Sequence, residues 1–245
     1  VLRLRRVALV GLRAESSRWP IIPDLLVGAI LLTAVAGGLP IIYGLSPLIM
    51  PVALLAYAGM AAVLWWYRGF APLTPADRVT LGRAVLTMLL FGLLPVAEAM
   101  KDQAHLVFAL ALAAVVLDGV DGFIARRLRC ETAAGARFDM ELDALLLLIL
   151  CAWLVLWDRV GVWVLLIGVW RYLFVLIGLF RPALRRPLAA SQRRRIICAL
   201  QGVGLVLCLV PEFPDAAVAP TAAVLLGLLS YSFITDLRAS WKATK

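Results

Sequence analysis

Long apolar stretches, joined by short polar connections, run along almost the whole chain. A helix that crosses a bilayer needs about 20 mostly apolar residues. The stretches lack the alternation of apolar and polar positions that marks the strands of a membrane barrel. We therefore predict an all-α, polytopic membrane protein with eight transmembrane helices, near residues 21–42, 45–67, 80–100, 104–125, 138–157, 161–180, 196–211 and 216–235.

The overall composition agrees with this class of protein. Of the 245 residues, 64% are hydrophobic and 16% are charged, whereas soluble domains average about 45–50% apolar and about 25% charged residues. These values exclude an ordinary soluble enzyme. The four cysteines form no closely spaced pair, so we expect reduced packing residues rather than a zinc site or disulfides.

The basic residues predict the orientation in the membrane. All 24 Lys and Arg residues except Lys101, Arg159 and Arg171 fall on one side of the predicted topology, which includes both termini. Because positive charge accumulates on the cytoplasmic side, we expect both termini in the cytoplasm and a multi-pass location in a bacterial-type inner or plasma membrane. Short basic clusters between apolar stretches do not indicate nucleic-acid binding, despite the net charge of +9.

Four aspartates near the ends of two successive stretches are the strongest chemical signal. Asp118 and Asp121 are three residues apart, and Asp139 and Asp143 are four apart, so each pair lies on one helix face, whereas Glu141 points elsewhere. An uncompensated Asp at the centre of a membrane helix costs about 2.5–3.5 kcal/mol. We therefore expect a cation at this cluster, and hard oxygen ligands favour Mg²⁺ or Mn²⁺. The helices are expected to be antiparallel neighbours.

Other interpretations of the aspartates remain open from the residues alone. The carboxylates could form ion pairs near the cytoplasmic interface with Arg126, Arg127, Arg129 or Arg137. They could also pass cations through a transporter or channel. Simple ion pairing does not explain why Gly122, Ala125 and Gly135 share the same faces, where they leave room for a ligand.

The segment from Asp118 to Asp143 fits the pattern D-x2-D-G-x2-A-R-x8-G-x3-D-x3-D without a gap. This pattern resembles the signature of the CDP-alcohol phosphatidyltransferases. The resemblance covers roughly residues 72–236, which correspond to the six-helix core of that family. We therefore divide the chain into residues 1–70, a cytoplasmic juxtamembrane segment with two additional transmembrane helices, and residues 71–245, the transferase core. The fixed positions of the pattern are Asp118, Asp121, Gly122, Ala125, Arg126, Gly135, Asp139 and Asp143.

Segments on both sides of this pattern also resemble the family. Upstream, Thr80 and Arg83 stand at matching positions, and Asp77 stands where Asn is frequent. Downstream, the similarity includes Arg195 and Gln201 but has Cys198 where Thr is common.

The resemblance implies transfer of a phosphatidyl group from CDP-diacylglycerol to an alcohol, with release of CMP. It implies two ions of Mg²⁺ or Mn²⁺ on the four aspartates, with Asp143 also acting as the general base. It further implies a homodimer. The expected nucleotide-binding residues are Thr80, Gly122, Ala125, Arg126 and Gly135.

The acceptor alcohol is expected to be small, polar and phosphorylated, such as glycerol 3-phosphate or inositol phosphate. Arg171 lies inside a predicted span, where an arginine rarely occurs without an anionic partner or a cavity. Arg171, Arg181 and Arg195 are the candidate acceptor-binding residues, although the basic cluster at 181–195 also fits topology alone. A Mg²⁺-dependent membrane prenyltransferase is the alternative enzyme.

Overall fold

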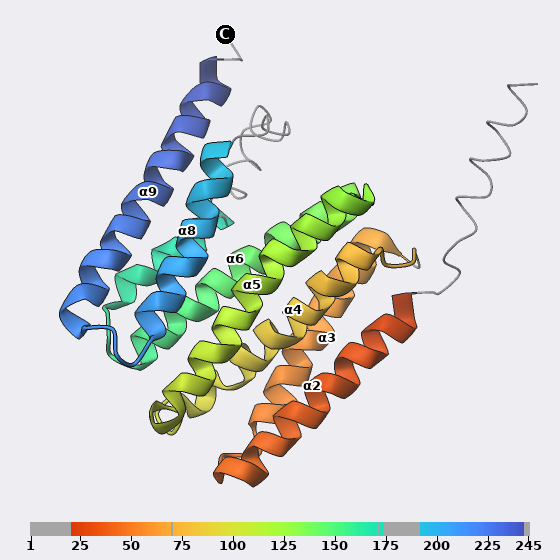
Figure 1. Cartoon of the computed structure of the whole chain (residues 1–245), viewed down its shortest axis with the longest axis vertical. Helices are drawn as coiled ribbons and strands as arrows, with labels where there is room; N and C mark the ends of the chain where they lie inside the picture. The colour runs from red at the N-terminus through yellow and green to blue at the C-terminus, as the bar shows by residue number, and fades with distance from the viewer. Residues whose placement is uncertain (1–20, 70, 171, 174–191, 243–245) are drawn as a thin grey trace, which may run out of the picture.

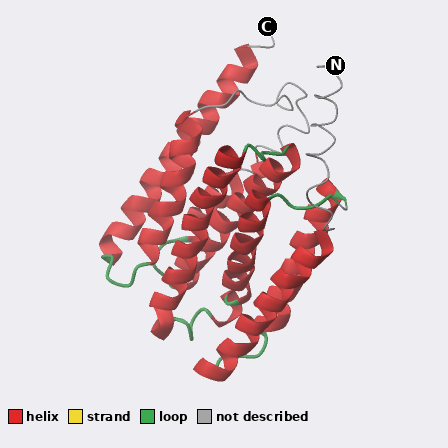
Figure 2. Cartoon of the chain, turned by 45° about the vertical axis from the view of Figure 1, so that its right-hand side comes forward, coloured by secondary structure: helices red, strands yellow, loops and turns green. Residues whose placement is uncertain are grey.

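The computed structural model describes residues 21–69, 71–170, 172–173 and 192–242, and the described part contains helices and no strands. The helices run side by side, with α2 and α3 on one flank of the bundle and α8 and α9 on the other (Figures 1 and 2). The predicted all-α class is confirmed. The long helices are α2 (Ile21–Tyr43), α3 (Ile49–Arg68), α4 (Pro75–Gly92), α5 (Ala104–Leu128), α6 (Ala133–Leu156), α8 (Gln192–Leu209) and α9 (Asp215–Lys242).

Five helical segments of the described chain are long and apolar enough to cross a membrane: Ile21–Tyr43, Ile49–Arg68, Pro75–Val96, Lys101–Leu128 and Asp215–Thr235. The chain is therefore a polytopic membrane protein. α6 and α8 occupy two more of the predicted spans but carry charged residues within them. The predicted span at 161–180 begins with the 3-10 turn η3 (Val162–Leu165) and continues as helix to residue 170.

Helix α4 is the centre of the bundle, because it packs against α2, α3, α5 and α6. The approach of α3 is close enough to exclude a side chain at one position. A Cβ atom on Gly92 would lie 2.6 Å from the Cβ of Ala53. Most residues of α4 are consequently buried, including polar ones.

The two ends of α4 are fixed by local sequence. At its start, Thr74 and Asp77 form a capping box, and Pro75 occupies the first turn. The helix stops at Gly92, earlier than the predicted span at 80–100. Pro95 lacks an N–H donor, and the 3-10 turns η1 (Leu94–Val96) and η2 (Lys101–Gln103) form much of the connection to α5.

Helices α5 and α6 differ from the predicted antiparallel neighbours in one respect. Neither packs closely along the other; instead, both pack against α4 and α8. The polar side chains of α4 can therefore reach the space between α5 and α6, and this is where the aspartates lie.

Candidate active site

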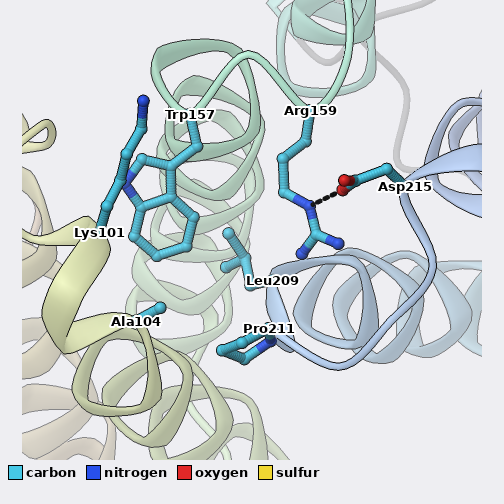
Figure 3. Close-up of a pocket in the computed structure, with 7 residues that line it drawn as sticks. All are labelled: Lys101, Ala104, Trp157, Arg159, Leu209, Pro211 and Asp215. Atoms are coloured by element: carbon cyan, nitrogen blue, oxygen red, sulfur yellow. Dashed lines mark hydrogen bonds and ion pairs between the residues drawn. The ribbon is translucent and has the colours of Figure 1, made fainter.

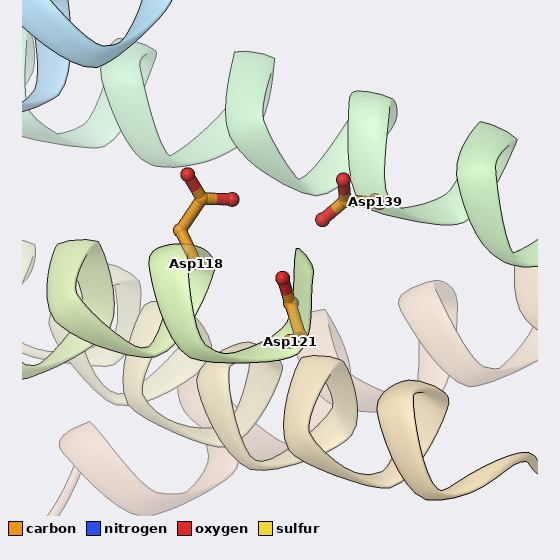
Figure 4. Close-up of side chains that lie close together, drawn as sticks. All are labelled: Asp118, Asp121 and Asp139. Carbon is orange, nitrogen blue, oxygen red and sulfur yellow. The ribbon is translucent and has the colours of Figure 1, made fainter. Parts of the chain in front are cut away.

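The aspartates on α5 and α6 converge as the sequence predicted. Asp118 and Asp121 project from α5 toward Asp139, which projects from α6 (Figure 4). One carboxylate oxygen from each of these three residues lies within 4.8 Å of the others. Asp143 lies one helical turn further along α6 and joins the cluster through a partner on α4.

That partner is Arg83, whose side chain is 0% exposed. Its Nη1 donates to the carboxylates of Asp118 and Asp143, and its Nη2 donates to Asp139. The same Nη2 lies 3.9 Å from Oδ2 of Asp121. A single guanidinium from α4 therefore links all four carboxylates of α5 and α6.

Arg83 supplies positive charge to the cluster, a role for which the sequence suggested a metal ion or the arginines at 126–137. The distribution of basic residues places Arg83 on the cytoplasmic side, but the structure buries its side chain fully within α4. The sequence did contain the signal: an arginine within an apolar helix, three residues after Thr80 and on the same face. Arg83 is therefore a member of the candidate site that the sequence did not predict.

The cluster has the donor set of a Mg²⁺ or Mn²⁺ site. Its four aspartates offer only hard oxygen ligands, which these ions prefer, and one guanidinium cannot balance the charge of four carboxylates. The side chains of Asp118 and Asp139 are 40% and 37% exposed, so ions can approach from solvent. The residues present therefore fit divalent metal binding.

Thr80, an expected nucleotide-binding residue, contacts the acidic cluster directly. It is buried, and the single hydrogen of its Oγ1 is shared between Oδ2 of Asp121, at 2.8 Å, and the more distant Ala76 carbonyl oxygen, at 3.2 Å. The hydroxyl holds one carboxylate oxygen of Asp121 in a fixed direction. In this structure Thr80 therefore orients a candidate metal ligand.

We expect Thr80→Val to weaken Mn²⁺ binding by about tenfold, because groups that orient a metal ligand typically contribute 10–100-fold to affinity. Titration of the purified protein with Mn²⁺, followed by electron paramagnetic resonance, measures the effect. Thr87→Val is the matched control, since Thr87 is also buried in α4 but donates to the Arg83 carbonyl oxygen, at 2.9 Å, and to no carboxylate of the described residues. Equal affinities in the two variants would contradict the orienting role of Thr80.

The small residues of the motif have different surroundings. A Cβ on Gly122 would lie 3.2 Å from Nη1 of Arg126, which folds back over the glycine. A Cβ on Gly135 would lie only 2.4 Å from Oδ1 of Asp77 and 2.9 Å from Oγ1 of Thr132. Ala125 is partly buried on the same helix as Gly122. The close approach of Asp77 is thus one reason for glycine at position 135.

A small cavity of about 30 Å³ adjoins the acidic cluster between α5, α6 and α8. Asp118 and Asp143 line one side of it, and Cys198 and Gly202 line the α8 side. The position where Thr is common in the family, here Cys198, faces this cavity. Gln201 does not line it; its Nε2 donates to the Leu225 carbonyl oxygen at 2.8 Å and joins α8 to α9.

The structure places one of the three candidate acceptor-binding arginines. Arg195 is exposed in the first turn of α8, three residues before Cys198. Arg171 and Arg181 lie outside the described residues.

A larger cavity, of about 230 Å³, lies near the opposite ends of these helices (Figure 3). Arg159 lines it, but this side chain donates to the carbonyl oxygens of Cys208 and Val210, each at 2.8 Å, and to Asp215 at 3.0 Å. Arg159 therefore caps the C-terminal end of α8 by binding its last carbonyl oxygens, which is a structural role. Nearby, a hydrogen bond with the His105 ring lowers the pKa of Glu212. None of the four aspartates lines this cavity.

Comparison with known proteins identifies the family. The model of one family, described as CDP-alcohol phosphatidyltransferase, matches residues 73–233, whereas no curated protein and no solved structure gives a significant match. The matched region contains Arg83 and all four aspartates and leaves α2 and α3 outside. Because the match covers well over half of the chain, the protein belongs to the CDP-alcohol phosphatidyltransferase family and is a phosphotransferase.

Proposed function

We propose that the protein transfers the phosphatidyl group of CDP-diacylglycerol to the hydroxyl of a small phosphorylated alcohol and releases CMP. The family supports transfer of a phosphatidyl group from a CDP-alcohol. The observation that carries the proposal is the convergence of four aspartates from α5 and α6 beside a cavity within an apolar helix bundle. A donor with two acyl chains can keep them in the bilayer while its pyrophosphate reaches the carboxylates.

Asp118, Asp121, Asp139 and Asp143 would hold Mg²⁺ or Mn²⁺. When bound, such ions neutralise the pyrophosphate and stabilise the charge that develops during phosphoryl transfer. Thr80 keeps Asp121 in its orientation. We propose Gly122, Ala125, Arg126 and Gly135 as nucleotide-binding residues, with Arg126 as a cation for the nucleotide phosphates.

We propose that Asp143 removes the proton from the acceptor hydroxyl. It borders the cavity between α6 and α8, and its side chain is 24% exposed. The acceptor oxygen attacks the phosphorus that carries the diacylglycerol, and a new P–O bond forms. The P–O bond to the bridging oxygen breaks, CMP leaves with that oxygen and its electron pair, and the Asp143 carboxylate holds the proton.

Arginines support a phosphorylated acceptor. Arg195 lies on the same face of α8 as Cys198 and Gly202, which line the cavity. An arginine fork binds phosphate oxygens in bidentate fashion. Glycerol 3-phosphate and inositol phosphate are the acceptors we propose, with Arg171 and Arg181 as further candidate ligands.

The orientation and assembly are part of the same proposal. Arginines lie near the helix ends that carry the aspartates, among them Arg68 at the end of α3, Arg78 near the start of α4 and Arg126 in the last turn of α5. Because such clusters mark the cytoplasmic side, we propose that the site faces the cytoplasm. The family resemblance supports a homodimer.

The test is an assay of the purified protein with labelled CDP-diacylglycerol, Mg²⁺ or Mn²⁺, and a panel of alcohols. We expect CMP release that requires both metal and acceptor, and a lipid product that retains the acceptor phosphate. Product only from unphosphorylated alcohols would overturn the acceptor assignment. Turnover of a prenyl diphosphate, or cation flux in vesicles without CMP release, would instead support the alternative functions.

A further inference from the structure

One buried arginine connects the additional helices to the transferase core. Arg68, the last residue of α3, has a side chain that is 4% exposed. Its Nη2 lies 2.8 Å from Oδ2 of Asp77 and donates to Oγ1 of Thr132 at 2.7 Å. Its Nη1 donates to the Pro72 carbonyl oxygen at 3.3 Å. Arg68 therefore binds two core residues that are 55 positions apart in the sequence.

Both partners of Arg68 fix the start of a site helix. Oδ2 of Asp77 accepts hydrogen bonds from the Thr74 backbone N–H at 2.8 Å and from Thr74 Oγ1 at 2.6 Å, which completes the capping box of α4. Thr132 caps α6, where its Oγ1 accepts from the Gly135 N–H at 3.0 Å. The position of α4 relative to α6 is thus set where Arg68 joins their first turns.

Residues of the acidic cluster follow these caps directly. Thr80 lies three residues after Asp77 on α4, and Asp139 lies seven residues after Thr132 on α6. Oδ1 of Asp77 also occupies the space that a side chain at position 135 would need. A shift of the first turn of α4 therefore moves Thr80, and a shift of the first turn of α6 moves Asp139. Asp143 and its cavity lie two turns beyond Gly135 and are less affected.

Charge balance explains why this arginine accompanies this aspartate. Asp77 stands where Asn is frequent in the resembled family, and its side chain is only 10% exposed. A buried carboxylate requires a cation, whereas a neutral amide does not. The cation comes from residue 68, outside the matched region 73–233.

We propose that Arg68 is a positioning residue through which the additional helix pair fixes the donor side of the active site. It holds the first turns of α4 and α6 in register, so that Thr80, Asp121 and Asp139 bind metal and the CDP moiety together. This inference rests on the proposed function for its substrate, but its first readout is metal binding, which does not require turnover.

Arg68→Met is the primary variant, because it keeps much of the side-chain length and removes the charge. We expect the Mn²⁺ affinity to fall and the KM for CDP-diacylglycerol to rise, each by about tenfold, since a buried carboxylate loses its charged partner. The KM for the acceptor should stay within about twofold, because Asp143 and the small cavity lie further from the contacts of Arg68 than Thr80 and Asp139 do.

The double variant Arg68→Met with Asp77→Asn distinguishes positioning from general damage. Removal of both charges leaves no uncompensated carboxylate, so most of the Mn²⁺ affinity and the donor KM should return to the wild-type values. Arg78→Met is the matched control. Arg78 also links α4 to the additional pair, through Asp24 at 3.1 Å, but its side chain is 47% exposed, and we expect little change.

Three results would overturn the role of Arg68. They are an unchanged Mn²⁺ affinity in Arg68→Met, an equal rise in the KM values for donor and acceptor, and a double variant whose Mn²⁺ affinity and donor KM do not recover. Failure of the proposed function gives a different pattern. In that case the wild-type protein releases no CMP from CDP-diacylglycerol, while the differences in Mn²⁺ affinity among the variants persist.

Discussion

Asp143→Asn should reduce CMP release by about 10²–10⁴-fold, the usual contribution of a general acid or base, while Mn²⁺ and CMP still bind within a few-fold of wild type. The amide has nearly the shape of the carboxylate but cannot accept the proton of the acceptor hydroxyl. Asp118, Asp121 and Asp139 retain oxygen atoms within 4.8 Å of one another, so the site keeps three of its four acidic ligands.

Single-turnover release of labelled CMP, measured beside Mn²⁺ and CMP titrations, separates these effects. Asp215→Asn is the matched control, because it makes the same change at the far end of the bundle, in a side chain that is 85% exposed. Turnover near the wild-type rate in Asp143→Asn would remove the residue from its role as base. A parallel loss of binding would make it chiefly a metal ligand.

Arg83→Met should destabilise the metal-free protein by about 3–5 kcal/mol, the typical cost of removing one partner of a buried ion pair. The reason is the geometry of the cluster, since one guanidinium links all four aspartates. Added Mn²⁺ should restore more stability to this variant than to wild type, because divalent ions replace the lost positive charge among the same carboxylates.

Unfolding in detergent, with a chelator or with Mn²⁺, measures this difference. Arg78→Met is the control on the same helix, because its ion pair with Asp24 is partly exposed and contributes little. If Mn²⁺ stabilises Arg83→Met no more than wild type, the arginine and the metal do not share one set of carboxylates. A variant as stable as wild type without metal would contradict the counterion role itself.

The helical class and the acidic cluster could be predicted because both depend on local periodicity. An apolar run of about 20 residues without alternating polar positions is typical of a transmembrane helix. Spacings of three and four residues place Asp118 with Asp121, and Asp139 with Asp143, on single faces of their helices. The short connection between the two helices then brings the pairs to the same end of the bundle.

The centre of the site could not be predicted in the same way, because it depends on packing between distant helices. Arg83 approaches the cluster from α4, which lies against both α5 and α6, and no spacing within the motif indicates this. The role of Arg68 is equally nonlocal, since it joins α3 to the starts of α4 and α6. The early end of α4 follows a local signal, Pro95, which interrupts the apolar run.

The burial of Arg83 also has a consequence for biogenesis. α5 and α6 carry the four aspartates, and α6 is not among the helices apolar enough to cross a membrane by composition. Its partition from the translocation machinery into lipid is therefore unfavourable without a neighbour that offsets its charge. α4 is synthesised first and brings the arginine, so we expect α6 to leave that machinery only as part of an assembled α4–α5–α6 unit.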